Sequence, residues 1–142
     1  MNLDVIAKIL VDAGVGQLGQ TAGNNATPIF KNRMPATCTN GMVIRTPLEG
    51  IRVDNYLPGY FRTKFQIIVR SGVQAQGDAI SKAVMAALKN ERRMTYTDQN
   101  DAFLMQINYL VVDQLPIVYT RDDSGLNEWS LNFRISYCMD PV

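Results

Sequence analysis

The sequence contains no histidine, and this absence excludes several kinds of chemistry at once. Histidine is the most frequent general base and metal ligand in proteins, and it activates the nucleophile of serine and cysteine hydrolases. Only catalysis by carboxylates or by lysine stays open. We therefore expect a protein that is not an enzyme and that uses no cofactor and no metal.

Charge is also scarce, because Asp, Glu, Lys and Arg make up 19% of the 142 residues and the net charge is +1. A domain that grips nucleic acid through its phosphates usually carries a clear basic excess. Interface cores, in contrast, are depleted in charge. The composition therefore favours burial of surface against other protein subunits over binding to nucleic acid.

Long apolar runs are missing as well. No stretch approaches the ~18 consecutive apolar residues of a membrane span. Asp4, Lys8 and Asp12 interrupt the apolar pattern at the start, where a signal peptide needs a continuous run. Cys38 and Cys138 are the only cysteines and belong to no CxxC pair. We expect two small buried thiols in a reducing compartment, and a disulfide between them stays open as the alternative.

What is present fits one domain of α+β class, residues 1–142. Helical spacing of apolar residues predicts helices at 2–13 and 74–89. Alternating apolar residues predict strands at 29–30, 37–45, 61–70, 92–96, 103–113, 117–121 and 129–138. A turn signal at 122–125 predicts a hairpin between the last two. We expect a mainly antiparallel sheet with both helices packed on one face.

Residues 46–59 form the least regular segment, because two prolines and two glycines oppose both helix and central strand. The segment is nevertheless too apolar for a purely solvated loop. It either packs onto its own domain or forms an arm that a neighbouring subunit must cover. The candidate subunit-interface residues are Leu48, Ile51, Arg52, Val53, Tyr56 and Leu57.

Two motifs have the residue types of small-ligand sites, but the context of each motif argues against such a site. A GxGxxG string begins at Gly14, but it follows a predicted helix, whereas a dinucleotide site needs a preceding strand. Asp122, Asp123 and Glu128 form the one local carboxylate cluster. Their spacing does not match an EF-hand loop, and we interpret them as a surface turn rather than a cation site.

Basic residues recur on the polar face of two predicted strands. Arg62, Lys64 and Arg70 alternate along one strand, and Arg134 lies on the other. If the strands pair, the four residues form a modest basic patch. It would either face passing DNA and attract its phosphates without reading bases, or serve as a solvated or intersubunit salt-bridge surface, which we favour.

Several segments together resemble those of a known protein family. None of them is diagnostic alone, and the resemblance depends on their order and spacing. They are AGVG at 13–16, IFKNRMP at 29–35, PG at 58–59, FQIIVR at 65–70, a helix at 78–88, PIVYTRDDSG at 116–125 and WSLNFRI at 129–135. In this order and spacing the chain resembles the tail terminator proteins of long-tailed bacteriophages over nearly its whole length. Residues 17–26 depart from the family pattern, being longer and more polar.

The resemblance implies a structural protein that forms a hexameric ring at the head-proximal end of the tail tube. There it would end tube polymerisation and join the tail to the head connector. Its partners would be copies of itself, the tube protein, the connector and genomic DNA passing through the lumen without sequence readout, with no membrane. It would be assembled in the host cytoplasm and reside in the virion. The arm would supply one of the two different surfaces of a ring contact, and Asp122, Asp123 and Glu128 would touch the tube or connector.

Three alternatives compete with this interpretation. Another neck ring, such as a head-completion or connector-adaptor protein, would share the size and architecture. A small nucleic-acid-binding α+β domain is disfavoured by the near-neutral charge. A carboxylate-dependent enzyme would assemble its site from residues far apart in the chain.

Overall fold

Two long antiparallel strands form the centre of the molecule. In the computed structural model, which describes residues 1–18, 27–90, 92–121 and 125–139, β4 (Tyr60–Ser71) pairs with β8 (Leu126–Cys138) along its whole length. The pairing runs from Tyr60 opposite Cys138 to Ser71 opposite Asn127. Both strands alternate apolar and polar residues, so one face of the pair is apolar and is buried beneath the helices.

Six shorter strands complete an eight-stranded sheet of order β1-β2-β3-β4-β8-β6-β5, with β7 also paired to β8. Their bounds are β1 Gln17–Leu18, β2 Pro28–Lys31, β3 Gly41–Arg45, β5 Met94–Thr97, β6 Phe103–Val112 and β7 Ile117–Arg121. The β1–β2 and β2–β3 pairs are parallel and the other pairs are antiparallel. The sheet is therefore mixed but mainly antiparallel, which confirms the predicted α+β class.

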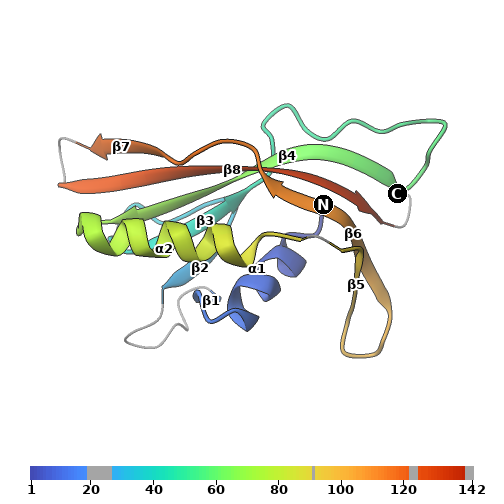
Figure 1. The fold of residues 1–142 in the computed structure, drawn as a ribbon, viewed down its shortest axis with the longest axis horizontal. Helices are drawn as coiled ribbons and strands as arrows, with labels where there is room; N and C mark the ends of the chain where they lie inside the picture. Colours follow the sequence, from blue (N-terminus) through green and yellow to red (C-terminus); the bar gives the residue numbers. More distant parts are fainter. Residues whose placement is uncertain (19–26, 91, 122–124, 140–142) are drawn as a thin grey trace.

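Both helices, α1 (Leu3–Asp12) and α2 (Gln74–Ala87), lie on the same face of the sheet, as predicted (Figure 1). The Asn2 side chain caps α1, since its Oδ1 accepts a hydrogen bond of 3.0 Å from the Asp4 backbone N–H. Val5, Ile6 and Leu10 of α1 are buried, whereas Ala13, which the predicted helix included, is exposed. Among the apolar residues whose spacing predicts α2, Val84 is buried but Ala83 is exposed.

The buried face of α2 consists of Gly77, Ser81 and Val84. These small residues let the helix approach the sheet closely. A Cβ added at Gly77 would lie 2.1 Å from the nearest ring atom of Trp129. The Trp129 indole N–H also donates a 2.8 Å hydrogen bond to Asp78 Oδ1, so the ring is held between helix and strand.

The core lies between this face of the sheet and the helices. Alternate residues of β8 fill it as predicted, each exposed by no more than 1%: Trp129, Leu131, Phe133, Ile135 and Tyr137. Phe65 of β4 stacks on Phe133 with ring centroids 5.1 Å apart. Burial of such side chains stabilises the fold by about 1.5–3 kcal/mol each.

Some predicted boundaries are wrong. The strand expected at 37–45 begins only at Gly41, and the one expected at 92–96 is Met94–Thr97. Helix α2, predicted to run to residue 89, ends at Ala87, and Asn90 forms an isolated bridge with Leu110. The hairpin of β7 and β8 is confirmed. Both cysteines are free and half-buried.

Candidate functional site

The segment between β3 and β4 contains no helix or strand, as predicted, and we call its residues 48–57 the arm. Figure 1 shows the segment as a drawn-out loop on the side of the sheet away from the helices. Leu48 and Tyr56 are 91% and 94% exposed, and Val53 and Leu57 are also exposed. These exposures match the predicted arm better than a loop packed onto its own domain.

The arm also lies against parts of its own domain, and one of these contacts is apolar. Ile51, which is half-buried, and Val53 line an apolar cavity of about 380 Å³ together with Phe61 and Tyr137. A turn follows, in which Asp54 Oδ1 accepts a 2.9 Å hydrogen bond from the Tyr56 backbone N–H. The cavity holds Ile51 and Val53 against the domain, and the turn fixes the residues that follow. The side chains of Leu48, Tyr56 and Leu57 stay exposed.

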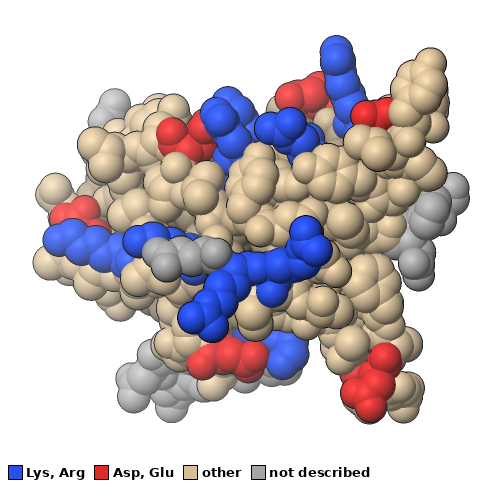
Figure 2. Space-filling model, turned by 45° about the vertical axis from the view of Figure 1, so that its right-hand side comes forward, with Lys and Arg blue, Asp and Glu red and all other residues tan. Residues whose placement is uncertain are grey.

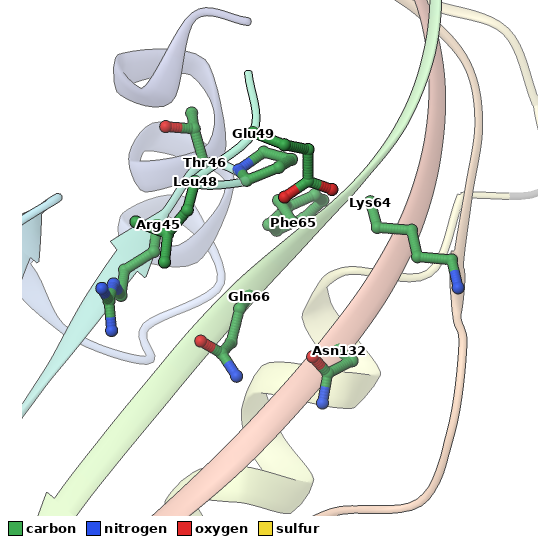
Figure 3. A pocket seen from close by; sticks show the side chains of 9 residues that line it. Arg45, Thr46, Leu48, Glu49, Lys64, Phe65, Gln66 and Asn132 are labelled. Carbon is green, nitrogen blue, oxygen red and sulfur yellow. The ribbon is translucent and has the colours of Figure 1, made fainter. Parts of the chain in front are cut away.

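A polar hollow of about 290 Å³ lies at the root of the arm, on the sheet face away from the helices. Figure 3 shows Arg45, Gln66 and Asn132 extending from three neighbouring strands beside it, with Lys64 pointing away. Gln66 and Asn132 both donate hydrogen bonds to Ser130 Oγ, at 2.6 and 3.2 Å. Ser130 is itself only 4% exposed, so the network fixes the amide side chains of Gln66 and Asn132 on this face of the sheet.

Three residues of the predicted basic patch lie on that same face. Lys64 and Arg134 sit opposite each other in the β4–β8 register, and Arg62 is exposed nearby on β4. Asp113 bridges the first two, with Lys64 Nζ at 3.2 Å and Arg134 Nη2 at 2.7 Å. The hydrogen bond from Lys64, followed by the positive charges of Lys64 and Arg134, lowers the pKa of the Asp113 carboxyl. The carboxylate offsets part of the positive charge that the sequence predicted there.

Arg70 must be removed from the predicted patch, because it is only 7% exposed. Its guanidinium donates hydrogen bonds to the backbone carbonyls of Pro35, at 3.1 Å, and Cys38, at 3.0 Å. Its other terminal nitrogen lies 3.8 Å from Glu128 Oε2. Arg70 therefore fastens the loop before β3 to β4 and does not face a partner.

Of the predicted axial-contact residues, only Glu128 belongs to the part of the chain that the structure describes. Glu128 lies within β8 beside Arg70, and its side chain is only 20% exposed. Asp122 and Asp123 fall outside the described residues. Their contact with a tube or connector stays a prediction.

A second apolar surface was missed from the sequence. It follows the end of β6, the link at 113–116 and β7, and we call it the β7 edge surface. Its exposed residues are Val111, Val112, Leu115, Ile117, Val118 and Tyr119. The sequence signal for this surface is that β6 carries apolar residues on both of its faces, which is typical of a strand covered on both sides or used in assembly.

Charge on the remaining surface is mixed in sign. Figure 2 shows a row of Lys and Arg side chains crossing the middle of one face, with acidic side chains scattered around it. Four exposed basic residues lie in the second half of α2 or shortly after it: Lys82, Lys89, Arg92 and Arg93. Within the described ranges, no cluster of three or more Cys, Asp or Glu could hold a metal, and no helix is long and apolar enough to cross a membrane.

Together these features define a class: an α+β domain whose distinguishing surfaces are apolar and suited to contact with other proteins. The family model described as bacteriophage tail terminator protein matches residues 9–138. The chain therefore belongs to the bacteriophage tail terminator family and is a structural component of the phage tail. A search of curated proteins gave no significant match.

Proposed function

We propose that the protein forms a hexameric ring at the head-proximal end of the tail tube, where it ends tube polymerisation and joins the tail to the head connector. The observation that supports this most is the arm, whose Leu48 and Tyr56 are almost fully exposed in the single subunit. Exposed apolar residues that occur together on an irregular segment are typical of a surface that another protein covers. Membership of the terminator family makes a further copy the natural partner.

A ring acts here through its shape. Each subunit of a cyclic ring uses two different, complementary surfaces, one for each neighbour. One face of the ring would match the last ring of tube subunits, and the other would withhold the surface on which the next tube subunit docks. The second face is then free to bind the connector. DNA would pass through the lumen without base readout, and the net charge of +1 favours only weak attraction to its phosphates.

The test is Arg52→Glu combined with Tyr56→Ala. Both residues are exposed, so the subunit should fold normally while rings disappear from sizing chromatography with light scattering. Lys82→Glu with Gln76→Ala is the matched control, since it makes the same charge change on the exposed surface of α2. Intact rings in the arm variant would reject the arm as an interface.

A second assay addresses the tube. Purified wild-type protein added to polymerising tube protein should yield tubes of limited length, and the arm variant should let them overgrow. Tubes that lengthen equally with and without the wild-type protein would reject the terminating role.

A further inference from the structure

The two strands β6 and β7 share one side of β8. β6 pairs with it as far as Val112 opposite Phe133, and β7 resumes with Ile117 opposite Ser130. Residues 113–116 must therefore pass two residues of β8, Leu131 and Asn132, and the link bulges outward. Asp113 holds the start of the link to the sheet, through a 2.8 Å backbone hydrogen bond from its N–H to the Asn132 carbonyl and through its side-chain contacts with Lys64 and Arg134. Leu115, within the bulge, is 83% exposed.

Beyond the bulge, β7 is an edge strand. Among the described residues it pairs with β8 alone, so its other side presents backbone N–H and C=O groups to any strand that approaches. Natural proteins usually protect such an edge with charged residues, proline or a covering segment. In β7, Ile117, Val118 and Tyr119 are instead apolar or aromatic and 40–55% exposed. Pro116 precedes the strand and so removes no hydrogen-bond donor from it.

The same chain contains a segment that fits this edge. Ile51 and Val53 of the arm alternate with Arg52, a pattern that suits an added strand, and residues 51–54 have no strand partner in the structure. The five residues of β7 extend about 17 Å, and four residues of the arm would cover roughly 13 Å of that edge. The exposed Leu48 and Tyr56 lie on either side of this stretch and can contact Leu115 and Tyr119.

The positions of the two surfaces determine the kind of contact they can make. Figure 1 shows β7 near one end of the long axis, while the arm runs from the middle to the other end. One subunit cannot bring its own arm onto its own β7 edge without rebuilding that geometry. A contact between copies leaves one arm and one edge free at the ends of every chain, so it continues until a ring closes.

We propose that the arm of one copy docks on the β7 edge surface of the next copy, and that this pairing is the subunit contact of the ring. The inference rests on the ring-forming function proposed above and names the second surface that the function requires. It also explains why the arm and the β7 edge surface are both apolar in a chain of low charge.

The test mixes two variants that each lack one surface. The arm variant is Arg52→Glu with Tyr56→Ala, and the edge variant is Leu115→Asp with Val118→Lys. Each alone should be monomeric by light scattering. An equimolar mixture should form a heterodimer and nothing larger, because a single intact arm meets a single intact edge. Hydrogen exchange of the β7 amides should also slow at least tenfold in wild-type rings relative to either variant.

Other outcomes overturn the inference in distinguishable ways. Rings formed by the edge variant would leave the ring proposal standing and remove β7 from the contact. If the arm variant forms dimers, and adding the edge substitutions to that variant abolishes them, then β7 pairs with β7 of another copy. A mixture that stays monomeric, although both variants melt like folded protein, would also refute the pairing. Should the edge variant fail to fold, Leu115→Ser alone replaces it, with weaker rings expected. A wild-type chain that is monomeric at every concentration overturns both proposals.

Discussion

The close seating of α2 on the sheet makes Gly77→Ala the most informative test of the fold. The added Cβ would lie 2.1, 2.2 and 2.5 Å from three ring atoms of Trp129. Carbon atoms pack at about 3.5–4.0 Å, so the ring or the helix must move by more than an ångström. Overpacking of this kind costs about 1–3 kcal/mol, and displacing the ring also endangers the hydrogen bond to Asp78, worth about 1 kcal/mol.

Alanine partly offsets this cost, because it favours a helix over glycine by about 1 kcal/mol. We therefore expect Gly77→Ala to lower the free energy of unfolding by about 1–3 kcal/mol. The assay is urea unfolding followed by circular dichroism at one fixed protein concentration, since assembly adds concentration-dependent stability. Gly72→Ala is the control, because its Cβ would meet only Leu126 at an ordinary 3.5 Å.

A double-mutant comparison identifies the cause. In a Trp129→Leu background the three clashing ring atoms are gone, so Gly77→Ala should be neutral or stabilising by up to about 1 kcal/mol. An equal loss of stability in both backgrounds, or a gain in the wild-type background, would refute the argument.

Two further predictions concern buried or paired charges. Asp113→Asn should lower stability near neutral pH, because the folded state lowers the pKa of this carboxyl through Lys64 and Arg134. That stabilisation is present above the unfolded pKa of about 3.9 and is lost as the pH falls through the folded value, so the deficit of the variant should shrink in acid. Urea unfolding from pH 7 down to pH 3 checks this, and a deficit independent of pH would contradict it. Arg70→Met should cost on the order of 3 kcal/mol, since two buried carbonyls lose their charged donor and the ion pair with Glu128 is lost. It should also speed reaction of Cys38 with a thiol reagent, and unchanged labelling and stability would show that the loop is held by other contacts.

The spacing of apolar residues predicted those helices and strands that have one buried face along their length. The alternation from Trp129 to Tyr137 and the helical spacing of Val5, Ile6 and Leu10 reflect a single apolar environment along each element, so both were predicted correctly. The irregular backbone of residues 46–59 was also predictable, because prolines and glycines exclude regular structure there, whereas the sequence left open whether the segment packs on its own domain or is exposed.

The remaining features depend on contacts between distant parts of the chain. Nothing around Arg70 indicates that its donors reach carbonyls more than 30 residues earlier, at Pro35 and Cys38. Asp113 joins Lys64 to Arg134 only because the strand order brings β4, β8 and the bulge together. An edge strand, likewise, is defined by its place in the completed sheet, so the pattern of β7 alone could not show that its outer side lacks a partner.

The place of β8 in the sheet has a consequence for synthesis. Its residues 126–138 pair with β4, β6 and β7 and fill the middle of the core, yet they are translated after all of those elements. A nascent chain that has produced the helices and β4 still lacks β8, which fills the middle of the core, so it cannot complete its fold before residue 138 emerges from the ribosome. Translation itself thus sets the moment at which a subunit becomes competent to join its neighbours, and a chain interrupted before β8 would be left to proteolysis.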